Sequence, residues 1–286
     1  MSTQAKRREA GIDTLRTLSA GSFDPSRAAS ALVREHGALG TFGVDHVLGT
    51  LWNRPQLSRR DRSLIVLAFL ATFGAGAEEE LSFHIRGALN HGLSREQVEE
   101  IVHQVAGYAG FPMAMAASRV VQATWRTLDG LERSPKRSEG ILAGDEQRWQ
   151  AANEVRATMW AGRNAKDPEV DRAALVDALG AVGEMAFDFA FGELWSREAL
   201  SRRDRSMVTV AILGITRCTD ELKIHLRAAL NHGCSREELE EVMVHLSGYG
   251  GFPKAVEGIK AAYVVFAAID ERDLARSKSA DAPADD

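Results

Sequence analysis

Glu80 and His84 are four residues apart, and the same pair returns later in the chain as Glu221 and His225. Residues at this spacing share one face of an α-helix, so each carboxylate would lie beside its imidazole. A neighbouring carboxylate orients the ring and raises its pKa, which suits a general acid or base near neutral pH. The alternative is a surface ion pair or a buried structural histidine. Because the pair occurs twice in an otherwise apolar segment, the sequence favours acid–base chemistry.

A second polar stripe follows in each half of the chain. Glu241, His245 and Tyr249 recur at intervals of four and therefore share one face of a predicted helix. Each stripe ends in a Tyr-x-Gly-Phe-Pro sequence, which is typical of a turn and allows a purely structural role. The first half carries Glu100, Gln104 and Tyr108 at the matching positions.

Two arginines and two tryptophans also repeat. Arg62 and Arg205 each follow an aspartate in the first turn of a predicted apolar helix. A fixed guanidinium there could hold a ligand carboxylate, and the alternative is local capping with the preceding aspartate. Trp52 and Trp195 would belong to the core or, alternatively, form a platform for a ligand.

The sequence lacks the residues that metal, serine-nucleophile or nucleotide-cofactor sites require. The Glu-x-x-x-His spacing supplies two possible metal ligands, but no second histidine or cysteine pair completes a set. The sequence contains no Gly-x-Ser-x-Gly elbow, phosphate loop or dinucleotide fingerprint, so we expect no metal and no cofactor. His91 and His232 precede a glycine at a predicted helix end, where an imidazolium suits the helix dipole, and we expect them to be structural.

These residues recur because a long segment occurs twice. Residues 51–70 return as 194–213, and residues 78–102 return as 219–243. Trp52 and Trp195 are 143 residues apart, which indicates a duplicated domain rather than a solenoid of short units. We predict a first copy at 5–130 and a second copy at 147–273. A charged linker would join them at 132–145, and we expect the polar tail at 277–286 to be disordered.

Each copy is predicted to be helical throughout. Ser58 and Ser201 begin a Ser-Arg-Arg-Asp sequence that is typical of a helix N-cap. The following stretch is apolar on every face, which for a helix means burial on all sides. Ser94 and Ser235 begin capping boxes, and apolar residues then recur at helical spacing. The predicted fold class is therefore all-α, with two tandem domains.

Composition limits the partners. The chain of 286 residues has 45% hydrophobic and 26% charged residues, as in ordinary globular proteins. Its net charge of −5 argues against nucleic acid. No apolar run is long enough for a membrane span, the start lacks a signal-peptide core, and two cysteines cannot build a disulfide framework. We expect a cytoplasmic protein that binds neither membrane nor nucleic acid.

The ordered motifs resemble the γ-carboxymuconolactone decarboxylase family. Gly-x-Leu-Trp-x-Arg, Leu-Ser-Arg-Arg-Asp-Arg-Ser, Glu-Leu-x-x-His, Ala-Leu-Asn-His-Gly and Gly-Tyr-x-Gly-Phe-Pro occur in that order in both copies. The resemblance implies the helical alkylhydroperoxidase D-like fold, built as an oligomer, so a fused pair is expected to form a homotrimer or a multiple of one. It also implies decarboxylation of an acid lactone without a cofactor. That reaction requires a carboxylate anchor, a dry pocket and a proton donor.

The resemblance also suggests roles for the repeated residues. His84 or His225 matches the histidine of the Glu-Leu-x-x-His motif and would deliver the proton, oriented by the preceding Glu80 or Glu221. Arg62 or Arg205 would anchor a carboxylate, while His245 and Tyr249 would polarise a carbonyl or lactone oxygen. Since the second copy matches the family more closely, we expect loss of His225 to be the more damaging.

The thiol peroxidase branch of this fold has two cysteines where the chain has Cys218 and Glu221, or Ala77 and Glu80. Neither copy has both, so peroxide reduction by a dithiol is not expected.

Two family histidines are distributed unevenly. The second copy has His245 where the first has Gln104, and the first has His46 where the second has Phe189. Either one site has decayed, or sites assemble from both copies.

The expected substrate is a small or aromatic-derived carboxylic acid. The alternatives are cyclisation or rearrangement of a polyketide-like acid, and a non-catalytic oligomeric module that binds a ligand. A buried pocket around His84 or His225 would favour an enzyme, whereas a flat interface would favour the module.

Overall fold

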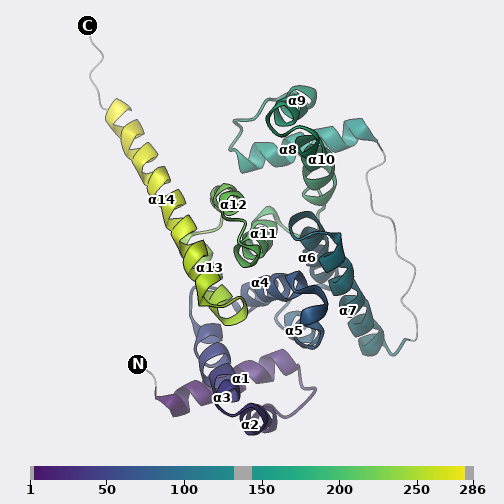
Figure 1. Ribbon diagram of the computed structural model, residues 1–286, viewed down its shortest axis with the longest axis vertical. Helices are drawn as coiled ribbons and strands as arrows, with labels where there is room; N and C mark the ends of the chain where they lie inside the picture. The colour runs from purple at the N-terminus through teal and green to yellow at the C-terminus, as the bar shows by residue number, and fades with distance from the viewer. Residues whose placement is uncertain (1–2, 132–143, 281–286) are drawn as a thin grey trace.

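The computed structural model describes residues 3–131 and 144–280, which form helices and, within those ranges, no strand (Figure 1). The predicted all-α class is therefore confirmed. The first half contains α1 (Gln4–Ser19), α2 (Pro25–His36), α3 (Ala38–Phe42), the π-helix η1 (Gly43–Leu48), η2 (Leu51–Asn53), α4 (Arg59–Thr72), η3 (Gly74–Gly76), α5 (Glu78–Asn90), α6 (Arg95–Tyr108) and α7 (Phe111–Asp129). The second half contains α8 (Asp145–Met159), α9 (Pro168–Leu179), α10 (Ala181–Met185), the π-helix η4 (Ala186–Leu194), α11 (Arg202–Thr216), α12 (Thr219–Asn231), α13 (Arg236–Tyr249) and α14 (Phe252–Ala280).

The predicted linker at 132–145 lies almost entirely outside the described residues. Of the tail predicted to be disordered, residues 277–280 belong to the end of α14, so the prediction was wrong there, and the remainder lies outside the described residues. Within the described ranges, no helix is both long and apolar enough to cross a bilayer.

The central helices α4 and α11 begin where the sequence predicts. The side chain of Ser58 accepts a hydrogen bond from the Asp61 N–H at 3.0 Å, and Ser201 accepts one from the Asp204 N–H at 3.1 Å. Residues 61–71 of α4 and 204–215 of α11 are all buried. The two helices pack against each other, which explains why they are apolar on every face.

The two copies share one hydrophobic core. The helices with capping boxes, α6 and α13, each pack against both α4 and α11, so each lies across the boundary between the copies. One continuous cluster of buried residues runs from Leu18 in the first half to Phe266 in the second. Neither copy therefore completes its core without the other.

The first-turn aspartates bind arginines across this boundary. The Arg60 Nη2 donates to Asp204 Oδ2 at 2.7 Å, and the Arg203 Nη2 donates to Asp61 Oδ2 at 3.2 Å. The alternative interpretation of the sequence, local capping, had each aspartate pair with the arginine that follows it. That arginine instead points into the core, so the pairing was wrong and the charge is shared between copies.

Each half adds an outer layer of helices. α1 packs on η1 and α5, while α8 packs on η4 and α12, and these layers lie at opposite ends of the molecule in Figure 1. The α1 backbone approaches Gly49 so closely that a Cβ there would lie 2.1 Å from the Arg7 carbonyl oxygen. Glycine is required at this contact, just before the segment that carries Trp52.

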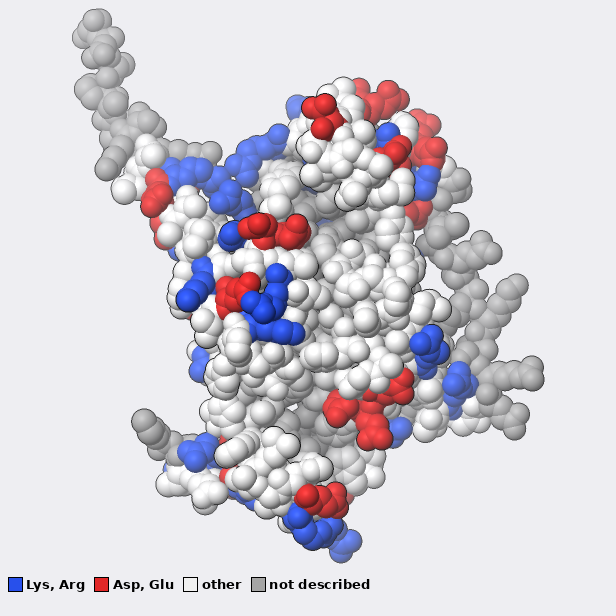
Figure 2. Space-filling model, in the orientation of Figure 1, with Lys and Arg blue, Asp and Glu red and all other residues white. Residues whose placement is uncertain are grey.

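Large apolar side chains are exposed at matching positions of the two outer layers. Leu39 on α3 and Val182 on α10 are 71% and 72% exposed, and Phe42 and Met185 are also exposed. Figure 2 shows that charged side chains of both signs form small groups on the visible face, with wide areas between them that carry no charged residue. Exposed apolar clusters of this kind are typical of contacts between subunits.

We therefore expect the chain to self-associate, and the family resemblance adds the expectation of a mass three times that of one chain or a multiple of this. Replacing Leu39 and Val182 together by aspartate should shift the protein toward monomer, because a charge cannot be buried without a partner. Light scattering at micromolar concentration measures the mass directly. A monomeric wild-type protein across that range would contradict the prediction.

Candidate functional site

The repeated histidines lie in two related clusters, each built from both copies. The first composite site combines Trp52 and His84 of the first copy with His245 and Tyr249 of α13. The second composite site combines Trp195 and His225 of the second copy with Gln104 and Tyr108 of α6. Each cluster therefore takes one wall from each copy, which favours the alternative that the sites assemble from both copies.

Four aromatic rings contact one another in the first composite site. The His84 ring stacks on Trp52 with centroids 5.7 Å apart, and the Tyr249 ring meets His84 edge-on at 5.8 Å. The His245 ring lies 5.5 Å from Tyr249 and 5.4 Å from Trp52. The Trp52 Nε1 donates a hydrogen bond to the Tyr249 hydroxyl at 2.8 Å, which fixes the first copy against the second.

The second composite site repeats the arrangement with one imidazole fewer. His225 stacks on Trp195 at 5.8 Å and meets Tyr108 edge-on at 5.1 Å. The Trp195 Nε1 donates to the Tyr108 hydroxyl at 2.7 Å. Both tryptophans therefore serve as core and as a platform for a histidine, with 1% and 0% of Trp52 and Trp195 exposed.

The glutamates do not orient the histidines as predicted. Glu80 and Glu221 are exposed in the first turn of their helices, while His84 and His225 are buried. Among the described residues, the Nδ1 atoms of both histidines have no hydrogen-bond partner. Burial, with a smaller contribution from a neighbouring histidine, lowers the pKa of each ring to about 3. The predicted rise in pKa is therefore wrong, and both rings are neutral at pH 7.

Arg62 orients His245 instead of presenting a free guanidinium to a ligand. Its side chain is fully buried, and its Nη1 donates to Glu241 Oε1 at 2.8 Å while lying 3.1 Å from His245 Nδ1. Its Nη2 donates to the backbone oxygen of Arg54. The role of carboxylate anchor predicted for Arg62 is therefore not supported, because this cation is already paired inside the protein.

This contact also assigns the proton on His245. An arginine only donates hydrogen bonds, so His245 Nδ1 must accept, and a neutral ring then carries its proton on Nε2. Burial, followed by the charge of Arg62, lowers the pKa of His245, which keeps the ring neutral. Nε2 is buried without a partner among the described residues. The first composite site therefore contains an unpaired N–H donor.

The matching donor in the second composite site is occupied. The Arg205 Nη1 donates to Glu100 Oε1 at 2.9 Å and to Gln104 Oε1 at 3.0 Å. The Gln104 Nε2 in turn donates to Thr209 Oγ1 at 3.0 Å. Val66 stands at the position of Thr209 in the first copy and offers no acceptor. Arg205 is thus also paired internally, and its predicted role as a carboxylate anchor is not supported.

The remaining predicted residues lie outside the two ring clusters or at their edges. His46 is exposed on η1, and Phe189 on η4 packs against Phe111 with ring centroids 5.8 Å apart. His91 and His232 each lie about 6 Å from a tryptophan ring, with Nδ1 2.7 Å from a serine hydroxyl. Burial lowers their pKa to about 4, so the predicted imidazolium is wrong although the contacts are structural.

Several residues of the sites were not singled out from the sequence. Arg54 and Arg197 bind the buried Glu241 and Glu100, and both occur in the repeated Leu-Trp-x-Arg motif that could have revealed them. Thr209 lies in a solidly apolar stretch, and only its hydroxyl distinguishes it from the valine in the other copy. Within the described residues, no three His, Cys, Asp or Glu side chains gather as a metal site would require.

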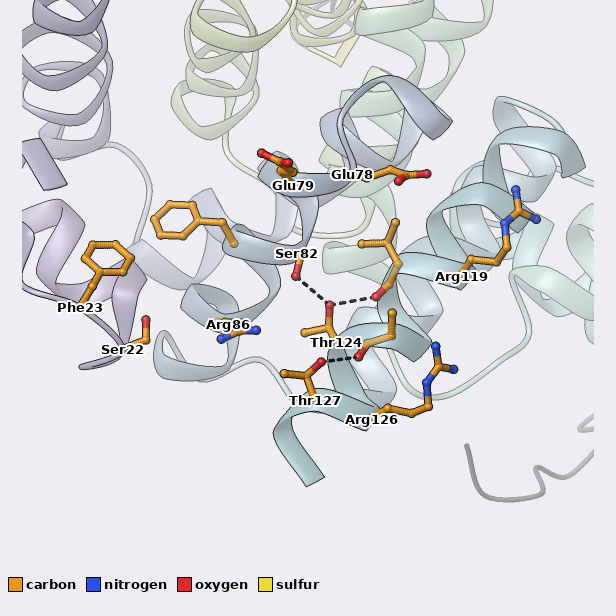
Figure 3. Close-up of a pocket in the computed structure, with 13 residues that line it drawn as sticks. Ser22, Phe23, Glu78, Glu79, Ser82, Arg86, Arg119, Thr124, Arg126 and Thr127 are labelled. Atoms are coloured by element: carbon orange, nitrogen blue, oxygen red, sulfur yellow. Dashed lines mark hydrogen bonds between the residues drawn. The ribbon is translucent and has the colours of Figure 1, made fainter. Parts of the chain in front are cut away.

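An open pocket lies beside the first composite site but does not include its rings. Its volume is about 730 Å³, and its walls come from the segment after α1, from α5 and from α7 (Figure 3). Phe83 lines the pocket, stacks on Phe23 at 6.0 Å and meets His84 edge-on at 5.2 Å. This one side chain therefore touches both the open pocket and the buried histidine.

The buried histidines predict a loss of stability in acid. The unfolded chain binds protons on the His84 and His225 rings below about pH 6.5, whereas the folded chain binds them only near pH 3. The free energy of unfolding should therefore fall as the pH drops through this window, by about 2 kcal/mol for each ring at pH 5. Urea denaturation at pH 7 and pH 5 measures the difference. It should shrink when both rings are replaced by phenylalanine, and an unchanged difference would contradict the assignment.

Comparisons with known proteins agree with this duplicated arrangement. The sequence profile of the carboxymuconolactone decarboxylase family matches residues 41–123 and again residues 180–263, together more than half of the chain. A 4-carboxymuconolactone decarboxylase of Acinetobacter baylyi is 45% identical over 78 residues, which are 27% of this chain and 58% of the relative. A nitrosuccinic acid decarboxylase of Metarhizium robertsii is 41% identical over 76 residues, 27% of this chain and 52% of the relative. The chain thus spans little more than half the length of these curated relatives.

Proposed function

The chain belongs to the carboxymuconolactone decarboxylase family, and on this premise we propose that it is a carboxy-lyase that releases CO₂ from a small or aromatic-derived carboxylic acid without a cofactor. Two relatives are named as decarboxylases of different acids, which supports the reaction class more than any one substrate. The observation that carries the proposal is the ring cluster of the first composite site, where neutral imidazoles are buried without carboxylate partners. The buried pocket expected around His84 is not what the structure shows; the open pocket reaches this ring only through Phe83, and this contact supports an enzyme over a non-catalytic module.

The chemistry explains why such a cluster suits decarboxylation. Breaking the bond to the carboxylate leaves an electron pair on carbon, and without a cofactor the substrate must itself hold that pair. A carbonyl, lactone or nitro group next to that carbon can do so. An enclosed aromatic cluster removes water from the carboxylate, whose charge is spread out in the transition state and therefore needs water less.

The donors of the site match the oxygens that gain charge. The His245 Nε2–H has no partner and would donate to the substrate oxygen that becomes negative as CO₂ leaves. The Tyr249 hydroxyl accepts from Trp52, which leaves its own proton for a second hydrogen bond to the substrate. Both groups come from α13, so the second copy supplies the polarising wall.

His84 would supply the proton that replaces CO₂ on carbon. The ring is neutral in the empty site, but an entering carboxylate brings a negative charge that favours the protonated imidazole. Binding would therefore draw one proton onto the ring. After the carbon–carbon bond breaks, the proton passes to carbon and the ring returns to neutral, so charge and protons balance over one turnover.

Incubation with 4-carboxymuconolactone and with nitrosuccinic acid tests the proposal. We expect CO₂ release from at least one acid, with a product lighter by one CO₂ in mass spectrometry. The His245→Gln variant serves as the control for the site. Conversion to a product of unchanged mass would favour cyclisation or rearrangement, and binding of the acids without conversion would favour a ligand-binding module.

A further inference from the structure

We infer that the two composite sites have different functions: the first carries the reaction, and the second is a hydrogen-bonded contact that holds the two copies together. This inference rests on the proposed function and assigns it to one of two related clusters. It follows from three differences between the copies: two of them meet in the second composite site, and the third lies on the segment that leads to this site.

The first two differences contact each other. Gln104 replaces the histidine, and its amide donates to Thr209 at 3.0 Å while its oxygen accepts from Arg205 at 3.0 Å. In the first composite site the same positions hold His245 and Val66, and the buried Nε2 of His245 has no partner among the described residues. The glutamine and the threonine complement one another, since a buried amide needs an acceptor. The Gln104 amide is therefore already hydrogen-bonded inside the protein, whereas the matching His245 Nε2 remains available to a ligand.

The third difference lies at the edge of the second composite site. Phe189 takes the place of His46, and it lies on η4, the segment that leads to Trp195 of the second composite site. Its ring packs against Phe111, the first residue of α7, and so closes an apolar contact between the copies. His46 lies on the matching segment before Trp52, and both His46 and Phe189 are exposed.

Taken copy by copy, each half lacks one family histidine. Taken site by site, one cluster keeps His84, His245 and the neighbouring His46, while the other has exchanged two of its three positions. Each exchange also adds a contact between the copies, either a buried hydrogen bond to Thr209 or a contact between the exposed rings of Phe189 and Phe111. The second composite site has therefore gained contacts between the copies at the positions where it lost imidazoles.

Two double variants separate these functions. His245→Gln with Val66→Thr gives the first site the closed pair of the second, and Gln104→Leu with Thr209→Val removes the closed pair without adding a donor. We expect the first variant to lose about 10²–10³-fold in CO₂ release, as on loss of one donor to an oxygen that gains negative charge. The second should keep its rate within about twofold but unfold at a lower temperature, because buried hydrogen bonds are lost.

Binding of succinate, an unreactive dicarboxylate, gives a second readout by calorimetry. We expect one succinate per chain, lost in His245→Gln with Val66→Thr and kept in Gln104→Leu with Thr209→Val. Two succinates per chain, no binding at millimolar concentration, or equal losses in both variants would overturn the inference. If wild-type protein releases no CO₂ from either acid but binds one succinate with this pattern, the proposed reaction fails while the assignment of the ligand site stands.

Discussion

Replacing His84 by alanine should lower kcat/KM for CO₂ release by about 10²–10⁴-fold, which is the usual effect of removing a positioned acid or base group. The matched change His225→Ala should cost far less, because Gln104 stands in the place of His245 beside His225 and its amide already donates to Thr209. This order reverses the expectation from the sequence, which favoured His225 because the second copy keeps His245. In the fold, His245 and His84 both contact Tyr249 and Trp52, so His245 shares a cluster with His84 rather than with the histidine of its own copy.

Initial rates of the two variants, measured with whichever acid is converted, show which histidine matters more for CO₂ release. Circular dichroism and melting temperature provide the control, since both rings stack on a tryptophan and their loss leaves similar cavities. Partial rescue of His84→Ala by added imidazole would identify a missing proton donor rather than a packing defect. Equal and mild losses in both variants would show that the histidines are structural.

Replacing Arg62 by methionine should destabilise the protein by about 3–5 kcal/mol, which is typical when one partner of a buried ion pair is removed. The loss would leave the Glu241 carboxylate, 1% exposed, with Arg54 as its remaining charged partner, and Arg54 lies partly in solvent. The same change removes the donor to His245 Nδ1, so the proton on Nε2 is no longer fixed. Activity should therefore fall together with stability.

Two comparisons separate these effects. Adding Glu241→Leu to Arg62→Met should recover part of the stability, because no buried charge remains unpaired, but it should not restore activity. The matched change Arg205→Met should cost stability while leaving most of the rate. Gln104, unlike His245, has no ring tautomer for the arginine to fix. Urea denaturation gives the free energies, and a loss below about 1 kcal/mol for Arg62→Met would contradict the ion-pair assignment.

Local signals predicted the helices well. The N-caps at Ser58 and Ser201 and the capping boxes at Ser94 and Ser235 are all formed, because each depends on residues within one turn of helix. The apolar stretches likewise predicted the two buried central helices, since a helix without a polar face has no surface to give to solvent.

The site was harder to predict because its contacts are not local. The spacing of Glu80 and His84 correctly predicted that both residues lie on the same helix. Glu80, however, lies in the first turn of α5, where its side chain is exposed, whereas His84 is buried. No local pattern shows that α13 packs on α4 and so brings His245 to Trp52. The family histidines could be found in the sequence, whereas their partners could be found only from the packing of one copy on the other.

The shared core has a consequence for how such a protein can change over time. A chain with a single copy would have to pair with itself, and each substitution would then enter both sites at once by symmetry. Joining the copies in one chain removes that constraint, because Gln104 and His245 are encoded separately. One composite site can then keep its functional residues while the other changes into a purely structural contact.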